Sequence, residues 1–291
     1  MQEMSLKALA KINLGLDVLG KRDNGYHDVR MVMQSIYLYD DVFLKKTEEE
    51  GVTIETNWGF LPVNENNIAY KAAKLLMEEF SLPGGIHIRL RKYIPVSAGM
   101  AGGSTDAAAV LFGMNRMYKL SLTQEELKQR GVLLGADVPY CIMRGTVLAE
   151  GIGEVLTPLP AMPKCYVLIA KPGISVSTKL VYEKLDAKEI KDHPDIDGVL
   201  KGLEEQDLKK VAASMGNVLE AVTIEEYPVI EAIKECMKKN GALNAMMSGS
   251  GPTVFGLFES RTAAKSAQQK IRHQGLARQV YLTKIHNVGR S

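Results

Sequence analysis

The alternation of apolar and polar positions along the chain predicts a series of β-strands. Residues 6–19 alternate and then reach a turn-rich cluster at residues 20–25, which predicts a strand followed by a loop. Further strand-like runs cover residues 37–45, 52–56, 85–94, 165–171, 245–247, 253–258 and 279–284. Segments with a different period separate these runs.

Apolar residues spaced three or four apart predict helices between the strands. The predicted helices cover residues 66–80, 105–118, 123–135, 176–185, 196–204, 207–215, 227–240 and 262–274. Asn67 could cap the first helix, and Thr123 with Glu126 forms a capping-box pattern at the start of the third. A proline cluster at residues 158–163 interrupts the pattern, so we expect two domains, 1–160 and 161–291.

Composition and charge indicate an ordinary globular protein with a small-molecule partner. Of the 291 residues, 46% are apolar and 24% are charged, and 36 Lys and Arg stand against 34 Asp and Glu. This mild balance argues against a nucleic-acid or membrane surface. The three cysteines lie far apart, which indicates neither a disulfide framework nor a zinc site. We therefore expect a cytoplasmic protein, with no apolar run long enough to cross a membrane.

The most informative segment is the glycine-rich junction between the predicted strand 85–94 and the helix 105–118. Its glycines permit backbone conformations that other residues avoid and let the chain come close to a ligand. The N–H groups that begin the following helix favour an anion, so phosphate is the natural ligand. Ser104 or Thr105 could add a hydroxyl group to the phosphate or to Mg²⁺. The spacing excludes the P-loop and dinucleotide motifs, and a plain strand-to-helix turn explains the glycines equally well.

Two charged residues have the chemistry that phosphoryl transfer needs. Asp137 follows a helix-ending glycine, and a carboxylate there could accept the proton of an acceptor hydroxyl. Lys11 and Asn13 face the same side of an otherwise apolar strand, and Lys11 could pair with Asp137 while stabilising the phosphoryl group. Taken alone, Asp137 is more typical of a turn residue that bonds its own backbone, and Lys11 of a surface lysine.

Two loops are candidates for substrate contacts. Tyr26 and His27 place an aromatic ring and an imidazole directly after the first strand, a pair suited to a nucleobase, although a hairpin with a packed tyrosine explains them too. The glycine-rich turn at residues 247–253 could close over a substrate or serve as a plain hairpin loop.

Taken together, these segments resemble the GHMP kinase superfamily along nearly the whole chain. The matching motifs are AKINLGLDVLGKRDNGYHDV (residues 10–29), PVSAGMAGGSTDAAA (95–109), GADVPYC (135–141) and SGSGPTVFG (248–256). The resemblance implies an α+β fold with an N-terminal lobe like domain 2 of ribosomal protein S5, a ferredoxin-like C-terminal lobe and an active site between them. It further implies ATP-dependent phosphorylation, with Mg²⁺, of the 2-hydroxyl of a cytidyl-linked methylerythritol in the non-mevalonate route to isoprenoids.

The resemblance also implies roles for individual residues. Asp137 would be the catalytic base and Lys11 its charged neighbour. The ATP phosphate loop would comprise Pro95, Val96, Ser97, Ala98, Gly99, Met100, Ala101, Gly102, Gly103, Ser104 and Thr105, with Ser104 as a possible Mg²⁺ ligand. Lys92 and Asn67 match positions near the adenine. Substrate contacts would come from Asn13, Tyr26, His27, Thr178, Tyr182, Ser248, Gly249 and Gly251.

The sequence departs mildly from the family pattern, and two alternatives stay open. Met100 stands where Leu is common and Thr105 where Ser is common, and the extra methyl of Thr105 bears on metal geometry. A homoserine or mevalonate kinase would not need the base-binding pair Tyr26 and His27. A silent ATP or metabolite sensor would be expected to lack Asp137 or Lys11, and both are present. We expect a monomer or a weak homodimer that binds neither nucleic acid nor membrane.

Overall fold

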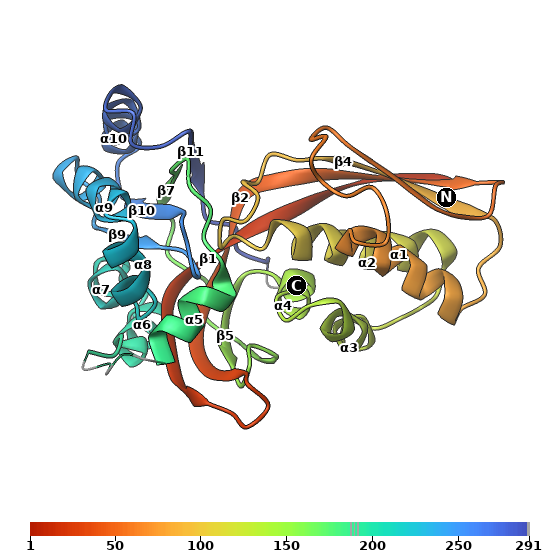
Figure 1. Ribbon diagram of the computed structural model, residues 1–291, viewed down its shortest axis with the longest axis horizontal. Coiled ribbons are helices and arrows are strands. Elements are labelled where there is room, and N and C mark those ends of the chain that lie inside the picture. The colour runs from red at the N-terminus through yellow and green to blue at the C-terminus, as the bar shows by residue number, and fades with distance from the viewer. Residues whose placement is uncertain (187, 189, 191, 290–291) are drawn as a thin grey trace. The chain divides into compact units, whose positions relative to one another are not determined.

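The computed structural model describes the chain except for residues 187, 189, 191, 290 and 291 (Figure 1). The chain forms two compact units that are not consecutive in sequence. Unit 1 comprises Met1–Ala10, Leu38–Val96 and Ala101–Met143, and unit 2 comprises Lys11–Tyr37, Ser97–Met100 and Arg144–Ser291. The long strands β1 (Glu3–Lys21) and β2 (His27–Thr47) each contribute residues to both units. The expected consecutive domains 1–160 and 161–291 differ from this division and stay a prediction.

Unit 1 is built from a small sheet and four helices. β4 (Gly85–Arg91) pairs antiparallel with residues 41–47 of β2 and parallel with β3 (Gly51–Thr56). The helices are α1 (Ile68–Glu79), α2 (Gly102–Tyr118), α3 (Gln124–Leu134) and α4 (Val138–Met143). α1 and α2 lie along one face of the strands in Figure 1. A Cβ at Gly113 would stand 2.4 Å from Leu44 Cδ1, so glycine lets α2 approach β2 closely.

Two predicted helix caps of unit 1 are confirmed. Asn67 caps α1 by accepting a hydrogen bond from Ala69 N at 3.0 Å. The Thr123 hydroxyl accepts from Glu126 N, while the Glu126 carboxylate accepts from Thr123 N, which completes the capping box of α3. Each cap satisfies N–H groups that the first helical turn leaves without a partner.

Unit 2 contains strands from both ends of the chain. β5 (Thr146–Glu150) pairs antiparallel with residues 31–34 of β2 and with β6 (Val155–Pro158), and β8 (Gly216–Asn217) runs parallel to β1 at Gly15 and Leu16. A second sheet is antiparallel throughout, and its strand order is β11 (Gln279–Lys284), β7 (Tyr166–Lys171), β10 (Val254–Phe258), β9 (Asn244–Met247).

The helices of unit 2 include two that cover this second sheet. α9 (Val229–Lys239) and α10 (Arg261–His273) pack against it, as Figure 1 shows. The other helices are α5 (Thr178–Asp186), α6 (Ile196–Glu204), α7 (Leu208–Ser214) and α8 (Glu220–Glu226). The antiparallel sheet with helices packed on it agrees with the expected ferredoxin-like lobe.

Several short elements were not expected from the sequence. α4, α8, β5, β6 and β8 span two to seven residues each, too few to show a clear period. α2 begins three residues before the predicted start, because its first residues are the glycines of the junction. Among the described residues, none of the helices is both long and apolar enough to cross a membrane.

Candidate active site

The glycine-rich loop at residues 95–105 ends in a helix start that suits an anion. Ser97, Gly99 and Ala101 have φ of 49°, 69° and 57°, a left-handed conformation that non-glycine residues adopt at a cost. Ala101 is the N-cap of α2, and in the described structure no side chain caps this helix. The first intrahelical bond runs from Thr105 N to Ala101 O at 2.9 Å, so the preceding N–H groups of the first turn have no partner within the helix. Such groups, at the positive end of a long helix, can bind phosphate oxygens.

A buried ion cluster holds both ends of this loop within unit 1. Lys92 Nζ donates to Asp40 Oδ2, to Asp106 Oδ2 and, at 3.3 Å, to Gly102 O. Asp40 Oδ1 accepts from the backbone N–H groups of Tyr93 and Ile94 at 2.5 and 2.8 Å. Asp40 thereby fixes the residues that directly precede the loop, while Lys92 contacts Gly102 near its C-terminal end.

The charges of this cluster are almost completely removed from water. The exposed fractions of Lys92, Asp40 and Asp106 are 4%, 0% and 2%. Burial raises the pKa of Asp106 to about 8, with Lys92 opposing this shift and Asp40 adding to it. Burial alone would lower the pKa of Lys92, but the two carboxylates outweigh it and the pKa is raised. Among the described residues, Asp106 Oδ1 has no hydrogen-bond partner.

The two residues predicted near the adenine are both used inside unit 1. The three N–H donors of Lys92 match its three acceptors, Asp40, Asp106 and the carbonyl of Gly102. The Asn67 side chain caps α1 and donates to Pro62 O at 2.9 Å. A contact of either side chain with the nucleotide stays a prediction.

Lys11 and Asn13 face the same side of β1, as predicted. Both are buried, and Lys11 Nζ donates to Asn13 Oδ1 at 2.8 Å. The Asn13 amide nitrogen lies 3.4 Å from Met31 Sδ. The Lys11 ammonium therefore fixes the position of the amide oxygen of Asn13.

Asp137 immediately precedes α4. Its side chain is half-buried, and its carbonyl accepts from Cys141 N at 3.1 Å, which starts the helix. Asp137 thus lies in a turn that follows Gly135, the C-cap of α3, as the sequence indicates, and the apolar residues after it form the buried part of α4. The role of Asp137 as a base and its pairing with Lys11 stay predictions.

Two of the predicted substrate-contact residues, His27 and Tyr182, come together in unit 2. The rings of His27 and Tyr182 lie 4.8 Å apart between centroids, tilted by 41°. His27 Nε2 lies 2.6 Å from Asp186 Oδ1, and Lys21 Nζ donates to Asp186 Oδ2 at 2.7 Å. Lys21 and His27 both lower the pKa of Asp186, since each stabilises the carboxylate. Tyr26 points into solvent, with an exposed fraction of 59%.

The sequence pattern did not indicate Asp186 as a member of this group. It lies four residues after Tyr182 on α5, a spacing that places both side chains on one helix face. That spacing was available from the sequence, but the contact with His27 joins residues 159 positions apart.

The second glycine-rich turn, residues 248–251, contacts the first glycine-rich loop within unit 2. Ser248 Oγ donates to Gly99 O at 2.9 Å, and a Cβ at Gly99 would stand 2.0 Å from Ser248 O. Ser250 Oγ and Thr178 Oγ1 lie 2.7 Å apart, so the predicted substrate contact Thr178 is adjacent to this turn.

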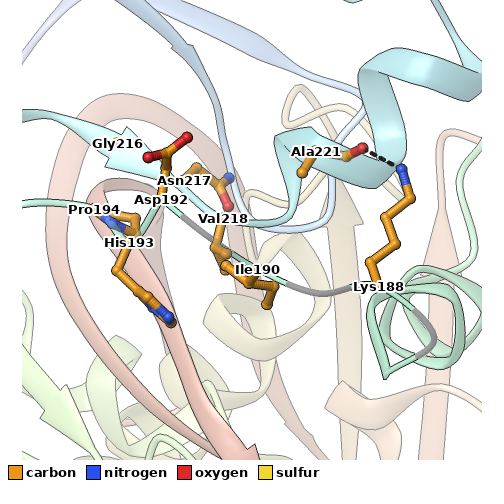
Figure 2. Close-up of a pocket in the computed structure, with 9 residues that line it drawn as sticks. All are labelled: Lys188, Ile190, Asp192, His193, Pro194, Gly216, Asn217, Val218 and Ala221. Atoms are coloured by element: carbon orange, nitrogen blue, oxygen red, sulfur yellow. Dashed lines mark hydrogen bonds between the residues drawn. The ribbon is translucent and has the colours of Figure 1, made fainter.

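Unit 2 also contains a cavity of about 470 Å³ that none of the predicted site residues line (Figure 2). Its lining comprises Lys188, Ile190, Asp192, His193, Pro194, Gly216, Asn217, Val218 and Ala221. The Lys188 ammonium is held by Ala221 O at 2.9 Å and by Glu225. His193 Nδ1 lies 2.8 Å from the buried carboxylate of Asp17.

Comparison with known proteins gives a consistent result over the full length. Residues 67–145 match the family described as the GHMP kinases N terminal domain, and residues 199–276 match the GHMP kinases C terminal family. A 4-diphosphocytidyl-2-C-methyl-D-erythritol kinase of Lachnospira eligens is 60% identical over 97% of this chain and 98% of its own length. The corresponding kinase of Lachnoclostridium phytofermentans is 56% identical over 98% of both chains.

Solved structures agree with this result. A crystal structure of 4-(cytidine 5'-diphospho)-2C-methyl-D-erythritol kinase superposes with a TM-score of 0.84 at 30% identity, covering 98% of this chain and 100% of its own. The high sequence identity over nearly the whole length decides the assignment. The chain belongs to the GHMP kinases and, within them, to the 4-diphosphocytidyl-2-C-methyl-D-erythritol kinase family.

Proposed function

We propose that this chain transfers the γ-phosphoryl group of ATP to the 2-hydroxyl of 4-diphosphocytidyl-2-C-methyl-D-erythritol, giving the 2-phosphate and ADP. The full-length similarity to kinases named for this substrate supports the assignment. The observation in the molecule that supports it most directly is the ring pair of His27 and Tyr182 beside Asp186. A cytosine ring offers both a face for stacking and polar edges for hydrogen bonds, and this group provides partners for each.

The loop at residues 95–105 would bind the phosphates of ATP. Its residues fit a phosphate group, since the first turn of α2 lacks a side-chain cap and begins with two glycines. Of the two hydroxyl residues there, Ser104 is half-buried and Thr105 is 1% exposed. Ser104 is thus the more accessible candidate ligand for the Mg²⁺ that would accompany ATP, because Mg²⁺ in such sites uses few protein ligands besides phosphates and water.

Three further residues would activate and orient the acceptor. Asp137 would accept the proton of the 2-hydroxyl, and Lys11 would keep that carboxylate charged and stabilise the transferring group. Asn13 would orient the acceptor, since its amide is already held by the Lys11 ammonium at 2.8 Å. Thr178, Ser248, Gly249 and Gly251 would contact the remainder of the substrate.

The proposal extends to the cellular setting. A metabolic kinase of this kind would work in the cytoplasm, as a monomer or weak homodimer, without nucleic acid. The net charge of +2 supports a small-molecule partner over a polyanion.

The test is ADP release by the purified protein with Mg·ATP. The acceptors compared are 4-diphosphocytidyl-2-C-methyl-D-erythritol, mevalonate, homoserine and none. We expect turnover with the cytidyl compound alone. Turnover with mevalonate or homoserine would refute the proposed cytosine pocket but would still support a kinase activity. ATP binding without any turnover would indicate a silent sensor.

A further inference from the structure

Asn217 is a buried residue whose side chain forms hydrogen bonds with one turn and with the start of one helix. Nδ2 donates to Met247 O at 2.9 Å and to Gly249 O at 2.8 Å, while Oδ1 accepts from Leu219 N at 3.0 Å. Its exposed fraction is 6%. Both amide protons are therefore directed at the turn that ends β9, and an aspartate or a leucine of similar size could not reproduce them.

The turn that Asn217 holds is in contact with the glycine-rich loop. Ser248, between the two carbonyls that Asn217 binds, donates from Oγ to Gly99 O at 2.9 Å. A Cβ added to Gly249 would stand 3.2 Å from Gly99 Cα, so the two backbones touch. Any shift of the turn would therefore be transmitted to Gly99.

The same residues connect back to β1. Val218 N, next to Asn217, donates to Leu16 O at 3.0 Å, and Lys11 N donates to Met100 O at 3.2 Å. The hydrogen bonds thus form a closed circuit from β1 through Asn217 and the turn to the glycine-rich loop, and from that loop back to β1. All of its members lie in unit 2.

We propose that Asn217 is a positioning residue for phosphoryl transfer, which sets the place of the glycine-rich loop relative to the strand that bears Lys11 and Asn13. The inference rests on the proposed phosphate role of that loop. The loop contains left-handed Ser97 and Ala101, which cost free energy and persist only where surrounding contacts fix them. Asn217 fixes the turn that contacts the loop midway between these two residues.

The size of the effect follows from what removal of the amide would leave behind. Asn217→Ala leaves two buried carbonyls without their donor, and buried unsatisfied groups are costly enough to displace a turn. If the displaced loop binds ATP poorly, we expect KM for ATP to rise by about tenfold or more, with a fall in kcat because the phosphate and the acceptor are no longer aligned.

Asn244 offers a matched control on the same strand. It is the first residue of β9, at the end opposite the turn, and its Nδ2 donates to Ala212 O at 2.7 Å while its Oδ1 accepts from Ala245 N at 2.8 Å. Asn244→Ala removes a comparable set of bonds without touching the circuit. We expect it to lower the melting temperature while leaving KM for ATP and kcat within about twofold of wild type.

The experiment measures steady-state kinetics, ADP binding by calorimetry and melting temperature for Asn217→Ala and Asn244→Ala. A rise in KM for ATP and in the Kd for ADP that is confined to Asn217→Ala supports the proposal. Equal effects of the two variants, or an Asn217→Ala enzyme with wild-type kinetics, would overturn it. If Asn217→Ala does not fold, Ser248→Ala provides the test, because it breaks the contact with Gly99 and leaves the bonds of Asn217 intact. Wild-type kinetics of Ser248→Ala would equally refute the proposed role of the circuit.

A further variant separates this inference from the function on which it rests. Gly103→Asp places a carboxylate in the first turn of α2, where it suits the helix dipole and where the new Cβ meets Ile68 Cγ2 at 3.2 Å. If phosphates bind there, the like charge should weaken ADP binding by about a hundredfold. Unchanged binding would refute the phosphate loop, whereas weak binding by Gly103→Asp with normal binding by Asn217→Ala would refute the role of Asn217 alone.

Discussion

Replacement of Lys92 by methionine tests whether this lysine stabilises unit 1 or binds the nucleotide. The ammonium is 4% exposed and is the partner of two carboxylates, Asp40 at 0% and Asp106 at 2% exposure. Lys92→Met keeps most of the volume and leaves both carboxyl groups buried without a cation. Removing one partner from a buried ion pair costs about 3 to 5 kcal/mol, a large part of the roughly 5 to 15 kcal/mol that holds a domain folded.

The loss should depend on pH in a defined direction. Without the ammonium that opposes it, burial raises the pKa of Asp106 still further above that of an unfolded aspartate, about 3.9, so the folded state binds more protons than the unfolded chain. Stability then falls as pH rises. The variant should be closer to wild type at pH 5 than at pH 8, and adding Asp106→Asn to Lys92→Met should recover part of the loss.

Urea unfolding followed by circular dichroism at pH 5, 7 and 8 gives the free energies, and KM for ATP is measured beside them. A free energy of unfolding within about 1 kcal/mol of wild type at pH 8, combined with a raised KM for ATP, would refute the structural role of Lys92. Lys92 would then be the nucleotide contact that the family resemblance implies.

Four further predictions follow from the site and the fold. Asp137→Asn should lower kcat by roughly 10²-fold to 10⁴-fold while ADP binding by calorimetry stays near wild type, and an unchanged kcat would remove Asp137 from the mechanism. Tyr26→Ala should weaken binding of the cytidyl substrate by about 1 to 3 kcal/mol, and an unchanged KM for that substrate would show that the cytosine pocket lies elsewhere. Thr123→Ala should cost about 0.5 to 2 kcal/mol in urea unfolding without changing activity, because it removes only the cap of α3. Asp106 has its folded pKa raised to about 8, so its contribution to stability is complete below about pH 4 and is lost as pH rises through about 8; Asp106→Asn should flatten that fall in urea unfolding.

Local rules predicted most of the elements whose determinants lie within one segment. The Asn67 cap, the capping box of Thr123 and the start and end of α6 and β11 agree with the sequence prediction, because a few neighbouring residues decide each of them. α4 and α8 were missed because a helix of six or seven residues shows little of a helical period. α7 is equally short but was predicted, since it begins at the capping residue Asp207, whereas α8 has no side-chain cap in the described structure.

The partners of the site residues could not be predicted in the same way. Lys92 lies 52 residues from Asp40, and Asn217 lies 30 residues from the turn it holds. Nothing in the neighbourhood of Lys92 distinguishes a nucleotide contact from a buried counter-ion, because the distinction depends on which side chains the fold brings to its ammonium. A pattern resemblance transfers the position of such a residue but not its partners.

The glycine-rich loop needs contacts from distant residues to hold its conformation. Ligand contacts from backbone N–H groups require a backbone that is already in place, because ordering it on binding would consume part of the binding free energy. The left-handed Ser97 and Ala101 make this loop costly to hold, and glycine at position 99 removes the Cβ that would otherwise separate it from Ser248. The chain offsets that cost at separate points, with Asp40 and Lys92 bonded to the loop ends and the circuit through Asn217 bonded to its middle. We therefore expect the N–H groups of the loop to keep a fixed arrangement only while both sets of contacts are intact. Under the proposed phosphate role of the loop, these distant residues would contribute to ligand binding.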